Sequence, residues 1–296
     1  MGFWAADDLA ILVRSVTGRH RIKRSVRIPL TGLHSLDVPR TAYAAGVRRH
    51  SWKFVNVNVM KSLPVALATG VACAAAGGLS WAAVAPSAQL FGPTICGTGD
   101  PSSIALTFDD GPNPAITPKL LDLLYQHNVR ATFFVIGRSV RAFPALAKQI
   151  SDRSHVIGNH TDTHPRLTFM LPRNIGSELV RCDQAIETAT GQHARWMRPP
   201  FGYRGPQLNA VIRQRGYAGV VMWSAKAYDW GEYNPDRIIN RLRGVRGGDI
   251  VLLHDGDHRS LEGDRRHTLA ALEYWLPRWK DAGIRFTTLD DLYPRT

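Results

Sequence analysis

The sequence of 296 residues has no Asp, Glu, Lys or Arg between residues 62 and 99, and the run from Leu63 to Ala85 consists mostly of small and apolar residues. A run of this length without charge is typical of a signal peptide or a membrane anchor. Four basic residues precede it: Arg48, Arg49, Lys53 and Lys61. They would stay on the cytoplasmic side, so we expect the following part to be exported to the periplasm, the cell envelope or the extracellular space.

Two outcomes are open for this segment, residues 60–88. Ala83-Val84-Ala85 has the small-x-small form of a cleavage site, although Pro86 is a poor residue directly after one, and Ala88 is a second candidate. Alternatively, residues 62–85 anchor the chain in the membrane, although they are rich in Ala and Gly rather than Leu. A buried helix of a soluble core is not expected, because the glycines of this run weaken any helix outside a membrane.

Residues 1–59 hold ten Lys or Arg against three Asp or Glu, so they supply +7 of the chain's formal net charge of +13. A segment this basic suits nucleic acid, but it has no zinc-finger spacing, recognition-helix pattern or interleaved aromatic residues, so we expect no nucleic-acid partner. Two interpretations remain. The segment is a basic cytoplasmic tail, or the start codon is placed too early, which we favour because Met60-Lys61 before the apolar run is itself a typical signal-peptide beginning.

Cysteine is scarce, with three residues in the chain. Cys73 lies in the apolar run, where it would be removed or buried in lipid. Cys96 and Cys182 can pair in an oxidising compartment, but the sequence does not require it. Cysteine therefore does not define the fold, and the composition, with 44% hydrophobic and 21% charged residues, is that of an ordinary globular protein.

Two adjacent carboxylates, Asp109 and Asp110, stand directly after the apolar run Ile104-Ala105-Leu106. Neighbouring side chains of an extended chain point in opposite directions, and Gly111-Pro112-Asn113-Pro114 then turns the backbone, so we expect the pair at the end of a strand. There, one acid can hold a metal while the other moves protons. Alone, Asp-Asp-Gly-Pro is also a common surface turn.

The segment His160-Thr161-Asp162-Thr163-His164 places two imidazoles four residues apart, which is a metal-ligand spacing if the segment makes a helical turn. Pro165 follows and favours a short turn or loop over the middle of a helix. A single pair of this kind is more often two solvated histidines. A nearby carboxylate, however, completes the set of two nitrogens and one oxygen that leaves a coordination position of a catalytic zinc open for water.

Three further segments accompany these two: Arg198-Pro199-Pro200-Phe201-Gly202, Tyr228-Asp229-Trp230 and Leu252-Leu253-His254-Asp255. In this order and at these separations, the five segments resemble the polysaccharide deacetylase (NodB-homology) family, carbohydrate esterase family four. Its members remove N- or O-acetyl groups from glycans. The resemblance covers roughly residues 103–292.

The resemblance implies four acid-base residues. Asp109 would be the general base, oriented by Arg198, and His254 would be the general acid, with Asp229 as its charged partner. Amide hydrolysis needs these groups because water is a poor nucleophile and an amine a poor leaving group. An imidazole paired with a carboxylate has a raised pKa, so it can hold the proton that it delivers.

The resemblance also implies a metal site and an acetyl pocket. The metal ligands would be one carboxylate and two imidazoles: Asp110, His160 and His164. They suit Zn²⁺ and would accept Co²⁺, Ni²⁺ or Mn²⁺. In the pocket, the backbone amide of Phe201 would help to bind the oxyanion, while Trp230 and Leu252 would form the walls around the acetyl methyl group.

One position departs from the family pattern, whose fourth motif usually reads Asp-x-x-Asp-Trp. Here the motif reads Lys226-Ala227-Tyr228-Asp229-Trp230, so a base replaces the first acid, while the second acid is present as Asp229. We interpret Lys226 as a change in local structure or substrate preference rather than a loss of activity.

From residue 103 onward, apolar strand-like runs alternate with amphipathic segments. The expected strands are 104–108, 131–136, 155–158, 195–198, 219–223, 249–253 and 284–287. The expected helices are 118–126, 144–150, 175–189, 206–215, 235–243 and 268–281. Seven strands alternating with helices indicate an α/β barrel with parallel pairing, and all five motifs then lie at or just after the carboxyl ends of strands.

The family's fold, an irregular (β/α)7 TIM-like barrel, agrees with this independent count. We therefore divide the chain into four parts. They are a basic extension (1–59), a signal peptide or membrane anchor (60–88), a linker (89–102) and a catalytic domain (103–296).

Three functions are weighed. The first is a metal-dependent deacetylase of an N-acetylated glycan, peptidoglycan or a chitin-like polymer, acting as a monomer that touches the membrane only through its apolar segment. The second keeps the fold and hydrolyses an O-acetyl ester or a small cyclic amide. The third is a glycan-binding protein without catalysis, which the complete set of acid-base groups and metal ligands disfavours because a binder needs few of them.

Overall fold

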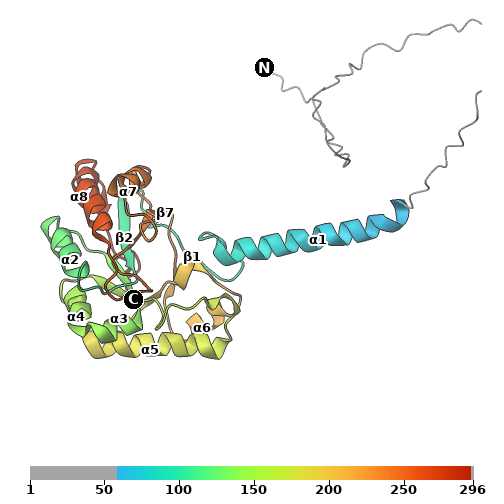
Figure 1. The fold of residues 1–296 in the computed structure, drawn as a ribbon, viewed down its shortest axis with the longest axis horizontal. Helices are drawn as coiled ribbons and strands as arrows, with labels where there is room; N and C mark the ends of the chain where they lie inside the picture. The colour runs from blue at the N-terminus through green and yellow to red at the C-terminus, as the bar shows by residue number, and fades with distance from the viewer. Residues whose placement is uncertain (1–58, 295–296) are drawn as a thin grey trace, which may run out of the picture. The chain divides into compact units, whose positions relative to one another are not determined.

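The computed structural model describes residues 59–294, so residues 1–58 of the predicted basic extension lie outside the described residues. In the described part, nine strands form one sheet, and every paired strand runs parallel to its neighbour (Figure 1). The strands are β1 (Thr94–Ile95), β2 (Ser103–Asp109), β3 (Thr132–Val135), β4 (Val156–Asn159), β5 (Trp196–Met197), β6 (Gly219–Val221), β7 (Ala225–Lys226), β8 (Ile250–His254) and β9 (Arg285–Phe286).

The strands follow the order β1-β6-β5-β4-β3-β2-β8-β7, and β9 pairs with β2 outside this path. The seven strands expected from the sequence are confirmed as β2 to β6, β8 and β9. Strands β1 and β7 were not predicted, because each contains only two residues and no apolar run marks so short a strand.

Helices lie between the strands. They are α2 (Thr117–Gln126), α3 (Gly137–Ala142), α4 (Pro144–Asp152), α5 (Pro172–Thr190), α6 (Leu208–Gln214), α7 (Pro235–Leu242), α8 (Arg266–Asp281) and α9 (Leu289–Leu292), with 3-10 turns η1 (Leu167–Phe169) and η2 (Pro200–Gly202). The six expected helices are confirmed as α2 and α4 to α8. Helices α3 and α9 were not predicted because they are too short to show helical periodicity. Figure 1 shows α2, α4, α5 and α6 following one another around the outside of the sheet.

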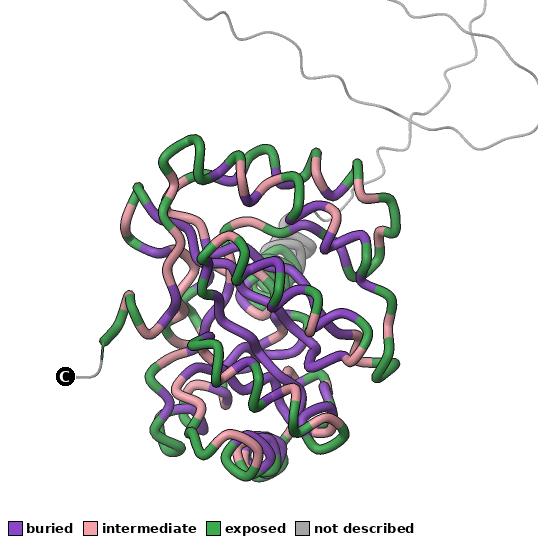
Figure 2. The backbone as a smooth tube through the Cα atoms, turned by 90° about the vertical axis from the view of Figure 1, so that its left-hand side faces the viewer, coloured by how far each residue is buried: buried purple, intermediate pink, exposed green. Residues whose placement is uncertain are grey.

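Side chains of the strands alternate between two buried layers, as the period of two along a strand requires. Residues of the outer face pack under the helices, among them Leu106, Phe108, Phe133 and Val251. Residues of the inner face, Ala105, Phe134, Trp196, Val221 and Ile250, form a second cluster, which Leu289 of α9 joins. Because β2 and β6 are separated by three strands yet share this cluster, the sheet is curled around it. In Figure 2 the buried backbone accordingly lies at the centre, with exposed segments around it.

Helix α1 (Val59–Val84) covers most of the predicted signal or anchor segment. Its residues 68–81 are exposed, which agrees with the expectation that it is not a buried core helix. Within the described residues, no helix is both long enough and apolar enough to cross a membrane.

Arg204 holds the chain just after this helix. The buried guanidinium of Arg204 donates from Nη2 to the carbonyls of Ala82, Ala85 and Ala88, at 3.1, 2.7 and 3.1 Å. Its backbone N–H donates to the carbonyl of Ala83 at 3.0 Å. Carbonyls at the end of a helix lack partners within the helix, and Arg204 supplies them.

The three cysteines are free thiols. The pairing of Cys96 with Cys182, which the sequence left open, is not formed: Cys182 is buried under the sheet, and the thiol of Cys96 donates to the carbonyl of Pro86 at 2.9 Å.

Candidate active site

Asp109, the last residue of β2, lies on the enclosed face of the sheet with Thr107. Arg198, which follows β5, is fully buried, and its Nη1 donates to Asp109 Oδ1 and to Thr107 Oγ1, both at 2.8 Å. Its Nε and Nη2 donate to the carbonyls of Val221 and Met222 at 3.2 and 2.9 Å. Four hydrogen bonds thus fix the guanidinium, which in turn fixes the Asp109 carboxylate.

Asp110, His160 and His164 are the one group in residues 59–294 whose side chains can share a metal ion, with ligand atoms within 4.8 Å of one another. Asp110 Oδ1 lies 3.5 Å from His160 Nε2 and 3.2 Å from His164 Nε2. His160 Nδ1 contacts the Arg198 carbonyl at 2.7 Å and therefore donates to it, so Nε2 is the ring nitrogen that faces Asp110.

The donor set fits a divalent cation. Asp110 Oδ1 is buried and accepts no hydrogen bond, although two imidazole nitrogens face it. Burial lowers the pKa of His164 to about 2, so this imidazole is neutral and keeps its lone pair. Burial alone would raise the pKa of Asp110, but the contact with His258 and the neighbouring imidazoles outweigh it and hold the pKa well below its usual range. One carboxylate and two imidazoles are a typical zinc ligand set.

The backbone of these ligands is unusual. Asp110, Thr161 and His164 have φ of 74°, 68° and 61°, in the left-handed region that costs a non-glycine residue on the order of 1–3 kcal/mol. Residues 160–164 consequently form a loop after β4, as Pro165 suggested, and not a turn of helix.

His254, the last residue of β8, is held by Asp229, which follows β7. Asp229 Oδ1 contacts His254 Nδ1 at 2.9 Å, and Oδ2 accepts from the His254 backbone N–H at 2.8 Å and from Thr268 Oγ1 at 2.9 Å. Burial alone would lower the pKa of His254, but the charge and hydrogen bond of Asp229 outweigh it and raise the pKa to about 9. His254 is therefore an imidazolium at neutral pH, and its Nε2–H can donate a proton into the cavity because Nδ1 is engaged with Asp229.

A cavity of about 600 Å³ connects these groups. Its lining includes the base candidate, the three metal-ligand candidates and the acid candidate: Asp109, Asp110, His160, His164 and His254. The predicted substrate-binding residues Phe201, Trp230 and Leu252 line it as well. Arg198 and Asp229 lie behind the lining, in contact with Asp109 and His254. The structure thus brings together all ten residues named from the sequence.

His258 is the residue that sequence reasoning missed. It belongs to none of the five motifs, but its Nδ1 lies 3.5 Å from Asp110 Oδ2 and its ring stacks on His164 with centroids 4.2 Å apart. Arg138 donates to its backbone carbonyl. The spacing from His254 gave no signal, because the approach depends on how the loop after β8 folds back.

That loop is pressed against the turn after β2. The backbone N–H groups of Asp255 and Gly256 both donate to the Asp109 carbonyl at 3.2 Å. A Cβ on Gly256 would lie 2.2 Å from the Asp110 carbonyl oxygen, and a Cβ on Gly111 would lie 2.3 Å from Asp255 Oδ2. Glycine is therefore required at position 256, and Gly111 leaves room for the Asp255 carboxylate. This contact carries the loop with His258 to the metal-ligand candidates.

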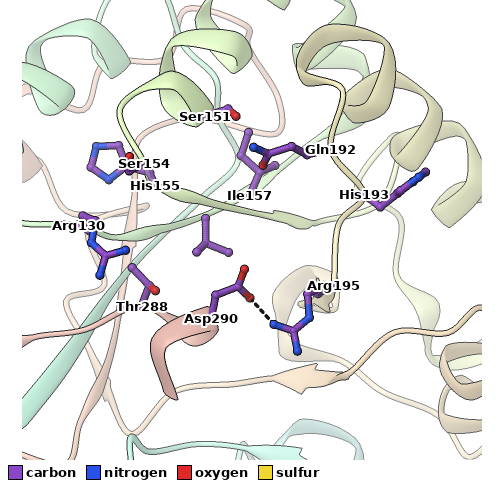
Figure 3. Close-up of a pocket in the computed structure, with 11 residues that line it drawn as sticks. Arg130, Ser151, Ser154, His155, Ile157, Gln192, His193, Arg195, Thr288 and Asp290 are labelled. Atoms are coloured by element: carbon purple, nitrogen blue, oxygen red, sulfur yellow. Dashed lines mark hydrogen bonds and ion pairs between the residues drawn. The ribbon is translucent and has the colours of Figure 1, made fainter. Parts of the chain in front are cut away.

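A second hollow lies at the amino ends of the strands and is separate from this site. Figure 3 shows its lining, with His155 and Arg195 at the starts of β4 and β5 and the ion pair from Arg195 to Asp290 of α9 at 2.9 Å. His155 Nδ1 accepts from the Ala131 N–H at 3.1 Å, so this histidine has a structural role. The hollow contains no metal-ligand group and has no part in the chemistry proposed below.

Comparison with known proteins identifies relatives with deacetylase names. Residues 97–220 match the family model described as polysaccharide deacetylase. A chitooligosaccharide deacetylase of Bradyrhizobium is 40% identical over 199 residues, covering 64% of this chain and 90% of that protein. A peptidoglycan-N-acetylglucosamine deacetylase of Bacillus cereus is 35% identical over 194 residues, covering 65% and 68%.

Among solved structures, a pseudoenzyme of carbohydrate esterase family 4 from Bacillus anthracis is 28% identical with a TM-score of 0.61, covering 68% of each chain. Similarity of fold therefore extends to a protein that has lost catalysis. The identity to the named deacetylases, the extent of their coverage and the matching motifs together decide the family. The chain belongs to the polysaccharide deacetylase family, whose named relatives here are hydrolases of amide C–N bonds.

Proposed function

We propose that the protein is a metal-dependent hydrolase that removes N-acetyl groups from a glycan, either peptidoglycan or a chitin-like polymer of N-acetylglucosamine. The observation that carries this proposal is the meeting of Asp109, the Asp110 group of metal-ligand candidates and the His254–Asp229 pair in one cavity. Named relatives act on both kinds of glycan, which supports the substrate class.

The acid-base residues have separate roles. Asp109, its Oδ1 held by Arg198, takes a proton from the attacking water with its free oxygen. His254 Nε2 gives its proton to the departing amine nitrogen, because Nδ1 is engaged with Asp229. The imidazolium that this step needs is the form favoured at neutral pH by the raised pKa.

The remaining residues bind and orient. Asp110, His160 and His164 would hold the metal, which we propose is Zn²⁺, with Co²⁺, Ni²⁺ or Mn²⁺ also suited to these donors. When bound, the cation supplies the Lewis acidity that polarises the acetyl carbonyl and acidifies water. The Phe201 amide binds the oxyanion, and Trp230 and Leu252 enclose the acetyl methyl group. Losing one oxyanion donor typically raises the barrier by roughly 3–4 kcal/mol.

The proposal also includes the barrel architecture of the catalytic domain and its location outside the cytoplasm. The curled sheet with its surrounding helices corresponds to an irregular (β/α)7 barrel over residues 103–296. Residues 60–88 act as a signal peptide or anchor and place a monomeric catalytic domain outside the cytoplasm, where cell-wall glycans lie.

The likeness to a pseudoenzyme makes the non-catalytic binder the alternative to exclude. The test is acetate release from N-acetylchitooligosaccharides and from peptidoglycan, measured after chelation, after adding zinc, and with the isosteric variant Asp109→Asn. We expect release that depends on zinc and is lost in the variant. Unchanged glycan binding with no acetate from either substrate, in folded metal-loaded protein, would favour the binder and contradict the proposal.

A further inference from the structure

Lys226 stands where the family usually has an acid, and the structure directs its side chain into the cavity. Strand β7 pairs with β8 in parallel register, with Lys226 opposite Leu252. Paired residues of neighbouring strands point to the same face of a sheet. Leu252 lines the cavity, so Lys226 extends to the same side, and both belong to its lining.

The charge of Lys226 is not neutralised by the protein. In residues 59–294, none of the ion pairs includes Lys226, and its ammonium lies 4.4 Å from the centroid of the Tyr228 ring. A cation over an exposed aromatic face gains only about 0.5–1 kcal/mol, so an anion can draw it away.

Two acidic groups, one in the cavity lining and one six residues after Lys226 in the chain, pair with arginines and not with Lys226. Asp257, also in the cavity lining, pairs with Arg265 at 3.2 Å and with Arg259 at 3.4 Å. Glu232 pairs with Arg237 at 3.5 Å and Arg241 at 3.3 Å. Lys226 is therefore an uncompensated positive charge on the cavity wall.

Aromatic side chains extend from the same segment as Lys226. Tyr228, Trp230 and Tyr233 line the cavity with exposures of 43%, 50% and 64%. Large apolar rings left this exposed beside a cleft mark a binding surface, and flat rings suit the apolar faces of sugars. A sugar unit on these rings would have its substituents within the field of Lys226.

We propose that Lys226 binds a carboxylate on the glycan, carried by the sugar next to the N-acetyl sugar that reacts, so that the protein prefers an acidic glycan over a neutral one. This rests on the proposed function and deepens it. Two carboxylates have the required chemistry: the acid of a lactyl ether on the neighbouring sugar, and the acids of a peptide attached through that ether.

The test compares three substrates with the zinc-loaded full chain. They are neutral N-acetylchitooligosaccharide, glycan strands with a free lactyl acid but no peptide, and strands that carry peptides. For each we measure kcat/KM and, by calorimetry, the dissociation constant. The variants are Lys226→Met, which keeps the side-chain length, and Lys226→Asp, which restores the family's charge. Lys148→Met is the matched control, because Lys148 lies on α4 and pairs with Asp152 outside the cavity.

For a partly exposed ion pair, removing one charge lowers the affinity by up to about fivefold, and reversing that charge lowers the affinity by about tenfold or more. We expect Lys226→Met to lower kcat/KM and affinity about fivefold on an acidic glycan and to leave the neutral one unchanged. Lys226→Asp should reverse the preference, Lys148→Met should behave as the unchanged protein, and added salt should shrink the effect. The peptide-free strands decide which carboxylate is bound.

Equal losses on neutral and acidic glycans, or no change in either variant, would overturn the role of Lys226 while leaving deacetylation intact. Absence of acetate from all three substrates would contradict the proposed function instead. In that case the dissociation constants still decide the inference, because the charge effect on binding does not need turnover.

Discussion

Replacing Asp229 with Asn tests whether the charge of Asp229 keeps His254 protonated, as a general acid must be. The change keeps the size of a side chain that is fully buried and removes only its charge. Asn can still accept from the His254 N–H and from Thr268 with its oxygen, at the place of Asp229 Oδ2. Its amide NH2 then faces His254 Nδ1, which becomes an acceptor, so the ring is left neutral with its proton on Nε2.

The size of the effect follows from the pKa of His254, about 9 with Asp229 ionised. Without that charge, burial opposes the imidazolium, Asp109 is paired with Arg198, and Asp110 would be paired with the metal, so we expect a pKa at or below the ordinary value of about 6.5. At pH 8 about 90% of His254 is protonated in the unchanged protein and at most about 3% in the variant, a loss of about 30-fold in active form. The imidazolium that acts as the acid is present at pH values below the pKa of His254. Activity should therefore fall as the pH rises through about 9.

The assay is kcat/KM against pH from 5 to 10, with thermal unfolding as a check on folding. We expect the alkaline limb near 9 to move below about 6.5 in Asp229→Asn. In a His254→Gln background, the same change should have little further effect, because the residue on which Asp229 acts is gone. An alkaline limb that stays near 9 in the variant would show that Asp229 does not raise the pKa of His254.

Three further outcomes are expected. Since His258 contacts Asp110, His258→Ala should weaken zinc binding about 10- to 100-fold in chelator competition, with the exposed His193→Ala as control, and unchanged affinity would contradict the positioning role. A chain that starts at residue 89 rather than 79 should lose about 1–3 kcal/mol in denaturant unfolding, because Arg204 loses buried carbonyl acceptors, and the difference should vanish with Arg204→Met. Burial lowers the pKa of His155 to about 4, so stability should fall as pH drops from about 6.5 to 4, by up to about 3 kcal/mol, and His155→Asn should remove this part of the pH dependence.

Much of the fold could be predicted because its strands are buried on both faces. In β2, β3 and β8 every residue is buried, so each appears in the sequence as a mainly apolar run next to an amphipathic helix. β7 has no such run, since its two residues are half-buried and exposed, and its place is set by pairing with β8. Such a strand is defined by its neighbour and not by its own residues.

Some residues of the candidate site could likewise be predicted from the sequence, and others could not. Asp109, His160 and His254 could be named because they directly follow or end strands whose carboxyl ends meet, and the motif spacing carries that information. The position of His258 could not be predicted, because it depends on a close backbone approach between Gly256 and Asp110 and on the Arg138 contact, neither of which leaves a local pattern. The hydrogen bonds from Arg204 to residues 82–88 could not be predicted either, because their acceptors are backbone carbonyls, which leave no pattern in the sequence.

Counting both products of the reaction shows directly whether the bond broken is an amide. Acetate and newly formed primary amine are measured together during turnover of a fully N-acetylated oligosaccharide by the zinc-loaded protein. We expect equal amounts of the two products, and we expect this turnover to be lost in Asp109→Asn. Acetate without amine from an O-acetylated glycan, with no release from the N-acetylated one, would contradict amide hydrolysis and identify an ester hydrolase on the same fold.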